Sequence, residues 1–301
     1  MAAMSEPDHR ILLPRLLEGV APALVFDGEP YEQPLEDVEF YAPLYMGDSD
    51  TLAAMARMPR LQVCQVLTAG YEHALPFLPD GVTLCNAAGV HDASTAELAV
   101  GLAIARLRGL DDFARAMPQG EWLHDARPSL ADRRVVVIGA GNVGTAIRRR
   151  LEPFEAEVVM VGRSAREGVR GADELPALLP GADVVIVAVP LTEQTRRLVD
   201  DAFLSLLPDA ALVVNVARGP VADTDAILRH AGRLRFALDV TDPEPLPSDH
   251  PLWREPSVLI SPHVGGNTSA FAPRIRGLVG EQVRLWSVGA PLLNVVAGPY
   301  S

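Results

Sequence analysis

The sequence of 301 residues predicts an α/β protein built on doubly wound parallel sheets. Three observations lead to this prediction. Apolar runs rich in valine and isoleucine recur through the middle of the chain, as in strands that are buried on both faces. Helical stretches separate these runs, so that each strand is followed by a crossover. Hydrophobic residues make up 49% of the chain, which is enough for the cores of two modest domains.

The middle of the chain alternates strands and helices in sequence order. The spacing of apolar residues predicts strands at 133–139, 156–162, 182–190, 211–218, 235–240 and 258–263. It predicts the intervening helices at 142–152, 173–179, 200–207 and 223–231. This order is that of a doubly wound parallel sheet.

The first part of the chain repeats the pattern less regularly. Its predicted elements are strands at 38–43, 61–70 and 82–89 and a helix at 51–58, with two further strand candidates at 11–17 and 22–26 that prolines blur. A long apolar helix is expected at 91–117, where Ser94 and Glu97 have the spacing of a capping box. We expect this helix to be buried between domains. A helix at about 268–288 precedes Pro-Leu-Leu-Asn-Val-Val, which we expect to return to the first part of the chain.

Composition excludes several classes of function. The net charge of −13 argues against general binding to nucleic acid or to anionic membranes. All 26 basic residues are arginines, so a P-loop lysine, a Schiff-base lysine and a lysine general base are excluded. No apolar run could span a bilayer and no secretory signal is recognisable, so we expect a cytoplasmic protein. We expect Cys64 and Cys85 to be core thiols rather than a disulfide or a metal pair, and we expect no metal.

A glycine-rich turn follows the strand predicted at 133–139. Gly139, Gly141 and Gly144 form Gly-x-Gly-x-x-Gly between a strand and a helix. In that context the first glycine permits the tight turn, the second lets the backbone approach a pyrophosphate, and the third allows close packing of the helix. An ordinary strand–helix connection is the alternative, but the repeated strand–helix context favours dinucleotide binding.

The end of the following strand distinguishes the two nicotinamide cofactors. An NAD site usually carries Asp or Glu there. Here Arg163 lies 19 residues after Gly144 and Ser164 follows it. An arginine can pair with the 2′-phosphate of NADP. The sequence therefore predicts that NADP is preferred and that NAD is possible.

Three further motifs fall at or after the ends of predicted strands, where open α/β sheets bind ligands. They are Asn-Val-Ala-Arg-Gly at 215–219, Leu-Asp-Val-x-x-x-Glu-Pro-Leu-Pro at 238–247 and Ser-Pro-His-x-Gly-Gly at 261–266. These motifs contain Arg218, Glu244 and His263, in that order along the chain. An imidazole suits proton transfer near neutral pH, a carboxylate can orient it, and a guanidinium can hold a substrate carboxylate.

In order and spacing, these motifs and the glycine turn resemble those of the D-isomer-specific 2-hydroxyacid dehydrogenases, a family that includes glyoxylate and hydroxypyruvate reductases. The resemblance covers the chain from about residue 38 to its end. It implies two Rossmann-like or flavodoxin-like lobes with the active site in the cleft between them, usually in a dimer. It places a substrate domain at 1–93 plus 289–301 and a dinucleotide-binding domain at 94–288.

The resemblance also implies the roles of individual residues. The catalytic residues are Arg218, Glu244 and His263, and Asp239 contacts the nicotinamide. Residues expected to bind the cofactor are Gly139, Gly141, Asn142, Val143, Gly144, Arg163, Ser164, Val189, Pro190, Thr195, Ala217, Asp239 and Gly265. Residues expected to bind the substrate are Ala69 and Gly70, through backbone N–H groups, together with Arg218 and His263. Tyr45 and Met46 are candidates for an apolar pocket wall.

The function predicted from these features is the reduction of a small 2-keto acid to the D-2-hydroxy acid by NADPH, with His263 as general acid/base. We expect a homodimer formed through the helix at 91–117 and its surroundings. A formate dehydrogenase is disfavoured, because such relatives pair Gln with His. A phosphite dehydrogenase of the same fold keeps the Arg–Glu–His set and stays open, as does a nucleotide-sensing protein similar to the corepressors of this fold.

Overall fold

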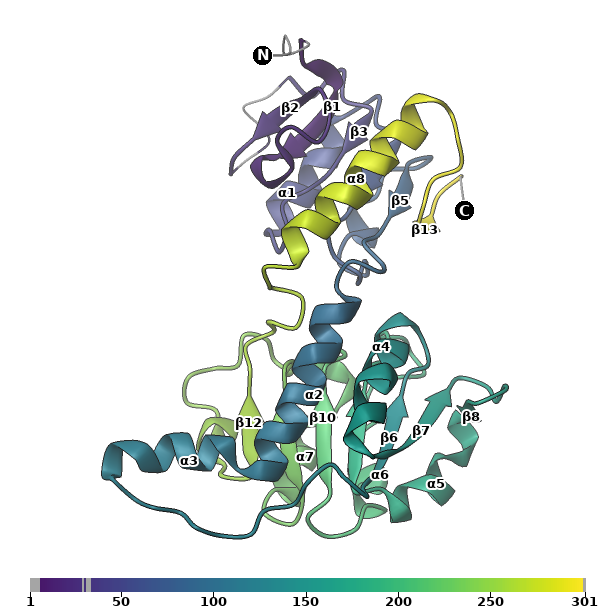
Figure 1. The fold of residues 1–301 in the computed structure, drawn as a ribbon. Helices are drawn as coiled ribbons and strands as arrows, with labels where there is room; N and C mark the ends of the chain where they lie inside the picture. Colours follow the sequence, from purple (N-terminus) through teal and green to yellow (C-terminus); the bar gives the residue numbers. More distant parts are fainter. Residues whose placement is uncertain (1–5, 29, 31–33, 300–301) are drawn as a thin grey trace. The chain divides into compact units, whose positions relative to one another are not determined.

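The computed structural model describes residues 6–28, 30 and 34–299 (Figure 1). The chain divides into two compact units. The first unit holds the described residues up to His91 together with those from Ser269 onward, and the second unit runs from Asp92 to Thr268. The outer ends of the predicted substrate domain, residues 1–5 and 300–301, lie outside the described residues.

The second unit is built on a parallel sheet of seven strands in the order β12-β11-β10-β9-β6-β7-β8. Its strands are β6 (Arg134–Ile138), β7 (Glu157–Gly162), β8 (Arg170–Gly171), β9 (Val184–Val187), β10 (Leu212–Asn215), β11 (Arg235–Leu238) and β12 (Val258–Ile260). Its α-helices are α2 (Asp92–Arg108), α3 (Leu110–Ala116), α4 (Asn142–Leu151), α5 (Leu175–Leu178), α6 (Asp201–Ser205) and α7 (Thr224–His230). The strand order reverses between β6 and β9, which is where such sheets bind ligands.

Helices cover both faces of this sheet. Along β6, Val135 and Val137 pack with residues of α2 and α4, whereas Val136 and Ile138 pack with residues of α5, α6 and α7. Successive side chains of a strand point to opposite faces, so an unbroken run of valine and isoleucine is buried on both sides. The predicted doubly wound sheet is therefore confirmed.

The prediction of a single helix at 91–117 was wrong. Gly109 has φ of +65° and ends α2, and α3 begins at Leu110. Since glycine adopts this left-handed conformation without strain, the chain turns there although the apolar pattern continues. The capping box was also wrong, because α2 begins at Asp92 and Ser94 lies inside its first turn. The Ser94 hydroxyl instead shares a hydrogen bond of 2.8 Å with the hydroxyl of Thr268.

The first unit contains a six-stranded sheet in the order β13-β5-β4-β3-β1-β2. Its strands are β1 (Asp8–Pro14), β2 (Ala23–Phe26), β3 (Phe40–Tyr41), β4 (Val63–Gln65), β5 (Thr83–Cys85) and β13 (Val295–Ala297), and its α-helices are α1 (Ser49–Ala53) and α8 (Phe271–Ser287). All neighbouring strands are parallel except β13, which pairs antiparallel with β5. The expected return of the last segment to the first part of the chain is thus confirmed.

Short 3-10 helices occur in the connections of both units. They lie at Arg15–Leu17, Ala54–Arg57, Leu75–Phe77, Met117–Gln119, Glu152–Phe154, Ala172–Glu174, Leu179–Gly181, Gly219–Val221 and Pro251–Arg254. In the part of the chain that the structure describes, no helix is long and apolar enough to cross a membrane.

Helix α8 packs in the first unit, whereas the predicted boundary at 288 gave it to the dinucleotide-binding domain. Its buried residues Ile275, Val279 and Val283 join a core that includes residues of β1, β3 and β4. The apolar stripe of a helix fixes its length and its buried face but not the sheet that this face meets. The residues that cross to the first unit therefore begin at Ser269.

The two cysteines are free, buried thiols on neighbouring strands, as predicted. Burial raises the pKa of the Cys64 thiol far above its usual range and that of Cys85 to about 11. Thiolates are the reactive and metal-binding form of cysteine, so both residues act as small apolar core side chains.

Candidate active site

Three neighbouring strands of the second unit carry the predicted catalytic residues just beyond their carboxyl ends. Asn215 of β10 aligns with Leu238 of β11, which aligns with Ile260 of β12. Arg218, Glu244 and His263 follow these three positions within a few residues. Residues far apart in the sequence are thus brought to one edge of the sheet.

His263 and Glu244 are in contact. The imidazole Nδ1 forms a hydrogen bond with Oε1 of Glu244, and about a third of each side chain is exposed (32% and 38%). A carboxylate on Nδ1 fixes that nitrogen as the protonated one, so Nε2 is the ring nitrogen available for proton exchange. Among residues 6–28, 30 and 34–299, none forms a hydrogen bond with Nε2.

Asp239, three percent exposed, holds the loop that carries His263. Its Oδ1 accepts hydrogen bonds from the Ser261 hydroxyl at 2.7 Å and the Val264 N–H at 3.0 Å, and its Oδ2 accepts one from the Gly265 N–H at 2.9 Å. Its carbonyl accepts the His263 N–H at 2.8 Å. His263 has φ of +51°, a left-handed conformation that this set of bonds imposes on a non-glycine residue.

Arg218 extends from a tight loop after β10. The Asn215 side chain accepts the Ala217 N–H at 3.0 Å and donates to the Arg218 carbonyl at 3.2 Å. A Cβ at Gly219 would overlap the carbonyl of Thr241, so only glycine lets this loop approach the loop after β11. The guanidinium donates to the Ala217 carbonyl at 2.7 Å, and no acidic side chain of the described residues pairs with it. Its positive charge is therefore available to an anion.

The glycine turn has the geometry of a dinucleotide site. Gly139 has φ of +118°, and a Cβ there would overlap the carbonyl of Ala188. A Cβ at Gly144 would overlap the carbonyl of Gly139, so the first turn of α4 packs directly on the loop. A Cβ at Gly141, the N-cap of α4, would meet no protein atom within 4 Å. Space above Gly141 next to the unpaired N–H groups of a helix start suits a pyrophosphate.

Arg163 lies beside this turn. The Gly139 N–H donates to the carbonyl of Val161 at 2.8 Å, so the end of β7 adjoins the glycine loop. Arg163 and Ser164 follow β7 directly and are exposed, and in the described chain no carboxylate forms an ion pair with Arg163. Arg166, which the sequence did not single out as a site residue, donates to the carbonyl of Ala140 at 2.8 Å.

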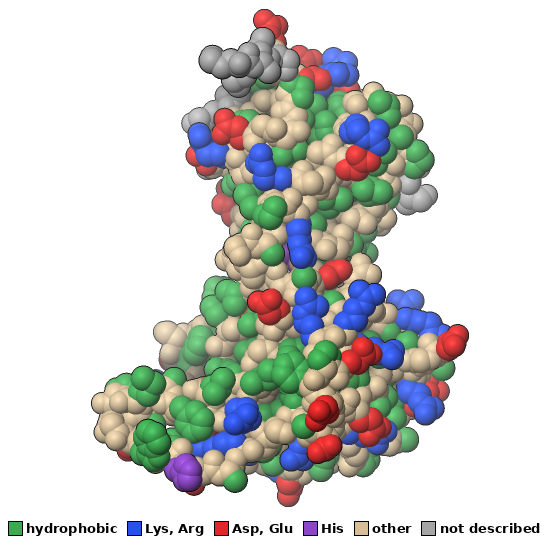
Figure 2. Space-filling model, in the orientation of Figure 1, with side chains coloured by type: hydrophobic (Ala, Val, Ile, Leu, Met, Phe, Trp, Pro, Cys, Tyr) green, Lys and Arg blue, Asp and Glu red, His purple; other side chains and the backbone are tan. Residues whose placement is uncertain are grey.

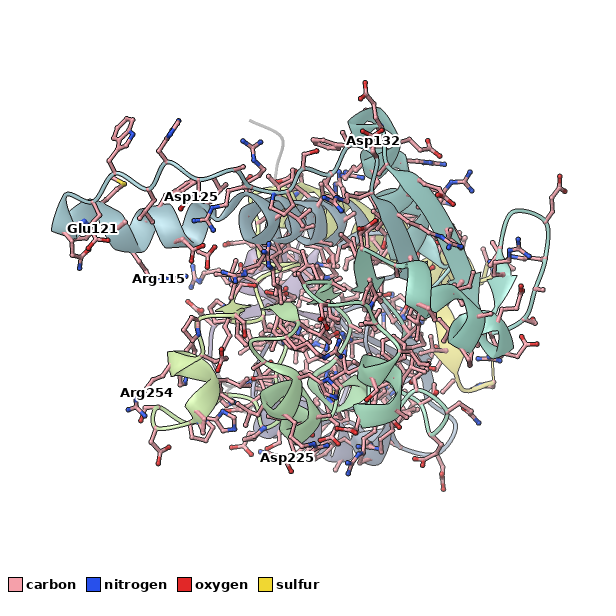
Figure 3. All side chains as sticks on the ribbon, turned by 90° about the horizontal axis from the view of Figure 1, so that it is seen from below. Arg115, Glu121, Asp125, Asp132, Asp225 and Arg254 are labelled. Carbon is pink, nitrogen blue, oxygen red and sulfur yellow. The ribbon has the colours of Figure 1, made fainter. Side chains whose placement is uncertain are left out.

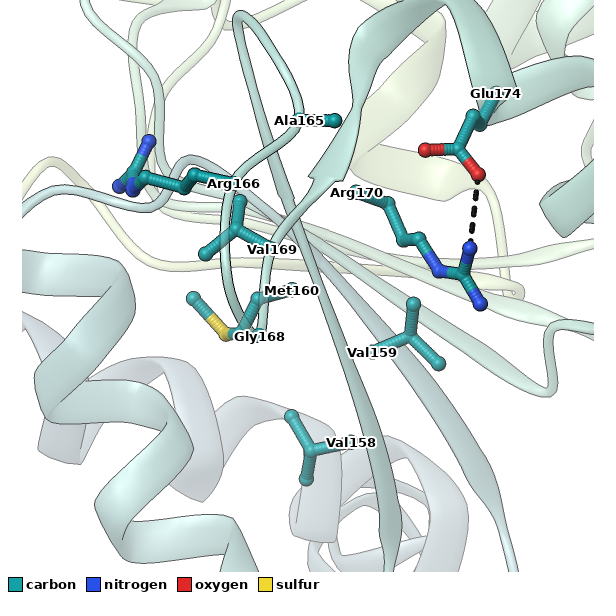
Figure 4. A pocket seen from close by; sticks show the side chains of 9 residues that line it. All are labelled: Val158, Val159, Met160, Ala165, Arg166, Gly168, Val169, Arg170 and Glu174. Atoms are coloured by element: carbon teal, nitrogen blue, oxygen red, sulfur yellow. Dashed lines mark hydrogen bonds and ion pairs between the residues drawn. The ribbon is translucent and has the colours of Figure 1, made fainter.

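A pocket of about 460 Å³ opens along β7 beside the loop 165–170 (Figure 4). Its lining includes Val158, Met160 and Arg166, and an Arg170–Glu174 ion pair lies at its edge. None of the predicted cofactor residues lines it. This pocket is therefore not the predicted dinucleotide site, which is defined by the chemistry of the strand ends.

The remaining predicted cofactor residues also lie at strand ends or helix starts. Asn142 and Val143 open α4, Val189 and Pro190 follow β9, and Ala217 follows β10. Thr195 donates from its hydroxyl to the Pro190 carbonyl at 2.6 Å and so closes the loop after β9. Their contact with a cofactor stays a prediction.

The predicted substrate turn lies in the first unit, after β4. Ala69 is half-buried and Gly70 is buried. Within the described residues, neither backbone N–H donates a hydrogen bond. Buried N–H groups normally have an acceptor, so two unused donors in successive residues suit an anionic ligand.

Tyr45 takes part in an aromatic cluster of the first unit. Its ring centroid lies 4.1 Å from that of Phe271, which is stacked with His91 at 5.1 Å. Burial raises the pKa of the Tyr45 hydroxyl. Met46 beside it is 58% exposed. Their role as a pocket wall stays a prediction.

Sequence reasoning missed three polar residues that hold the site loops, namely Asn86, Asn215 and Ser261. Each follows or ends an apolar strand, and that position was the available signal. The described residues contain no group of three or more His, Cys, Asp or Glu placed to hold a metal ion. On the face shown in Figure 2, acidic and basic side chains are interspersed rather than separated by sign.

Comparison with known proteins agrees with this geometry. The family model described as "D-isomer specific 2-hydroxyacid dehydrogenase, NAD binding domain" matches residues 100–265. The human glyoxylate reductase/hydroxypyruvate reductase is 33% identical over 224 residues, which are 69% of this chain and 68% of the relative. The chain therefore belongs to the D-isomer-specific 2-hydroxyacid dehydrogenase family. It is an NAD(P)-dependent enzyme of that family, as the sequence predicts.

Solved structures give the same result. A D-isomer-specific 2-hydroxyacid dehydrogenase from Xanthobacter autotrophicus Py2, in complex with NADPH and MES, has a TM-score of 0.80 and 29% identity, covering 95% of this chain and 98% of that one. An NADPH-dependent glyoxylate/hydroxypyruvate reductase from Sinorhizobium meliloti has a TM-score of 0.82 and 26% identity, covering 97% and 98%. The two-lobed α/β fold expected from the sequence is thus confirmed.

The glycine turn yields a paired prediction. Gly141→Ala adds a methyl group in open space, so it should leave the melting temperature unchanged and weaken cofactor binding by about tenfold or more. Gly144→Ala forces α4 off the loop and should lower stability by about 1–3 kcal/mol. Thermal melting and cofactor titration by nicotinamide fluorescence measure both. Equal cofactor affinity in Gly141→Ala and the unchanged protein would contradict a pyrophosphate site.

Proposed function

We propose that this protein reduces a small 2-keto acid of the glyoxylate or hydroxypyruvate type to the D-2-hydroxy acid, with NADPH as the preferred donor. The observation that carries the proposal is the His263–Glu244 hydrogen bond, which leaves Nε2 available at the same edge of the sheet that carries Arg218. Among the described residues, no acidic side chain pairs with Arg218. The names of relatives support the substrate class, since the human protein and the Sinorhizobium meliloti protein are both glyoxylate/hydroxypyruvate reductases.

The roles of the three side chains follow from their chemistry. Arg218 binds the substrate carboxylate and polarises the keto oxygen, because a planar guanidinium can donate to both. His263 gives the proton on Nε2 to the keto oxygen as the C=O π bond breaks. Glu244 accepts from Nδ1, stabilises the imidazolium beforehand and keeps the ring oriented. The nicotinamide cofactor, when bound, supplies the hydride that reaches C2.

The glycine turn and the end of β7 fit a bound dinucleotide. The open space at Gly141 and the start of α4 would hold the pyrophosphate. Arg163 would pair with the 2′-phosphate of NADPH, since no carboxylate in the described part of the chain forms an ion pair with its guanidinium. Two solved relatives bound to NADPH or NADP support this preference. Asp239 would reach the nicotinamide from the end of β11.

A homodimer fits the segment around α3. Met117 and Trp122 are 77% and 90% exposed, and large apolar side chains gathered on a surface mark interaction sites. In Figure 3, α3 and the segment labelled at Arg115 and Glu121 extend away from the sheet of the second unit. A second copy of this chain would bury these side chains.

The first experiment mixes the purified protein with NADPH or NADH and a panel of 2-keto acids, and follows the loss of nicotinamide absorbance. We expect NADPH oxidation with glyoxylate or hydroxypyruvate. His263→Ala should lower kcat by about 100- to 10,000-fold, because it removes the proton donor, and leave NADPH affinity unchanged. His9→Ala, which changes an exposed histidine of β1 outside the site, is the matched control.

Two results would contradict this function. Oxidation of phosphite, with no reduction of any keto acid, would assign the same residues to a phosphite dehydrogenase. Tight NADPH binding without any turnover would support the nucleotide-sensing alternative.

Arg163→Ala tests the cofactor preference. The loss of one charge-assisted ion pair should weaken NADPH binding by about ten- to a hundredfold, and NADH binding by less than about twofold. Arg149→Ala removes another exposed arginine of the same unit and controls for net charge. Equal losses for the two cofactors would rule out recognition of the 2′-phosphate by Arg163.

Trp122→Glu tests the homodimer. A charge in the centre of an apolar contact should convert the dimer to a monomer, measured by light scattering after size exclusion. Trp253, which is 48% exposed on another surface of the second unit, provides the control substitution to Glu. A monomeric unchanged protein, or a dimeric Trp122→Glu variant, would contradict the proposal.

A further inference from the structure

The substrate turn of the first unit is held by its carbonyl groups. The side-chain Nδ2 of Asn86 donates to the carbonyl of Ala69 at 2.7 Å, and the backbone N–H of Ala87 donates to the carbonyl of Thr68 at 2.9 Å. The Thr68 hydroxyl also donates to the carbonyl of Gly70 at 2.6 Å. Residues 86 and 87, just after β5, therefore bind two successive peptide groups of the turn.

Peptide geometry connects these bonds to the unused donors. In a planar trans peptide the C=O of one residue and the N–H of the next point in opposite directions. The carbonyl of Thr68 thus sets the direction of the Ala69 N–H, and the carbonyl of Ala69 sets that of the Gly70 N–H. Both N–H groups point away from Asn86 and Ala87. A hydrogen bond accepted by the carbonyl also polarises the peptide and makes its N–H a stronger donor.

Asn86 is itself fixed by the backbone around it. Its Oδ1 accepts the Ala88 N–H at 3.2 Å, and its own N–H donates to the carbonyl of Asn294 at 3.1 Å. Its carbonyl accepts from the Nε2 of Gln65 at 3.1 Å. The side chain that holds Ala69 therefore has a single orientation, with seven percent of the residue exposed.

Two fully buried glutamines extend this support to α8. Gln65 and Gln282 are both 0% exposed. The Nε2 of Gln282 donates to the Oε1 of Gln65 at 2.8 Å. The Oε1 of Gln282 accepts a hydrogen bond from the N–H of Leu293 at 2.7 Å. Gln65 then donates to the carbonyls of Val66 and Asn86. A continuous chain of amide hydrogen bonds thus runs from the segment after α8 to Asn86.

Burial in an apolar core makes the amides of Gln282, Gln65 and Asn86 destabilising unless all their hydrogen bonds are formed. The surrounding core is apolar, with Leu67, Cys85 and Val283 among its members. A buried amide that lacks partners costs free energy, whereas one with all its bonds made specifies a single arrangement. Apolar residues would fill the same space without that requirement. The amide chain is therefore explained better by the geometry that it imposes on the turn than by core stability.

We propose that Asn86 is a positioning residue for substrate, which aims the N–H groups of Ala69 and Gly70 at a carboxylate, and that Gln65 and Gln282 hold Asn86 in place. This inference rests on the proposed function for the identity of the ligand. It makes α8 and the segment after it part of the substrate-binding apparatus, although they lie more than 180 residues from the turn in sequence.

Steady-state kinetics with the preferred keto acid test the proposal. Asn86→Ala should raise KM by about tenfold or more and change kcat by less than about threefold, since a carboxylate anchor binds ground state and transition state alike. Gln282→Leu should raise KM in the same direction but less. Gln62→Ala is the matched control, because it also removes an amide side chain of the first unit, but one that bonds to Glu39 and Trp286 and not to the turn or to Asn86. NADPH affinity should be unchanged in all three.

A second measurement does not depend on turnover. In the unchanged protein, oxalate should shift the amide NMR resonances of Ala69 and Gly70, and in Asn86→Ala these shifts should require at least tenfold more oxalate. If the protein reduces no keto acid but oxalate shifts these amides in the Asn86-dependent manner, the proposed function fails and the inference stands. Unchanged KM and unchanged oxalate titration in Asn86→Ala would overturn the inference, as would the absence of amide shifts in the unchanged protein.

Discussion

The candidate active site depends on one buried carboxylate, that of Asp239. A carboxylate three percent exposed is stable only when its oxygens accept hydrogen bonds, and here all the donors come from residues 261–265. These bonds fold the chain after β12 back onto the end of β11. They hold His263 in a left-handed conformation and bring its ring to Glu244. His263, the proposed proton donor, is thus oriented by a group that need not touch the substrate.

Two asparagines at strand ends fix the loop after β10 and the loop after β5 through the same pattern of hydrogen bonds. Asn215 ends β10 and Asn86 follows β5, and in each the side-chain oxygen accepts the N–H two residues ahead. This Asx turn leaves the side-chain NH₂ free to bind a nearby carbonyl. In one case that carbonyl belongs to Arg218, and in the other to Ala69. Each asparagine thereby converts the end of a rigid strand into a fixed loop.

The sequence predicts what local patterns determine. Runs of valine and isoleucine place β6, β9 and β10 to within two or three residues, and the spacing of glycines identifies the turn before α4. The break at Gly109 and the attachment of α8 to the first unit were not predictable, because each depends on contacts with distant residues. The same holds for the site: Arg218, Glu244 and His263 are recognisable by order, whereas Asn86 and Ser261 are recognisable only by what they bind.

Charge explains why the first unit would use backbone N–H groups for an anion. The residues of the first unit, 1–91 and 269–301, contain 7 arginines and 14 acidic residues, so the surroundings of the turn repel a carboxylate at a distance. A backbone N–H group attracts an anion only at short range, and the strength of the attraction depends on the direction in which the N–H points. A cation there would form ion pairs with the neighbouring acids, whereas an N–H group fixed through its own carbonyl stays available. In the proposed site, support of the turn by Asn86 would therefore replace net positive charge in the first unit, and Arg218 would supply that charge in the second.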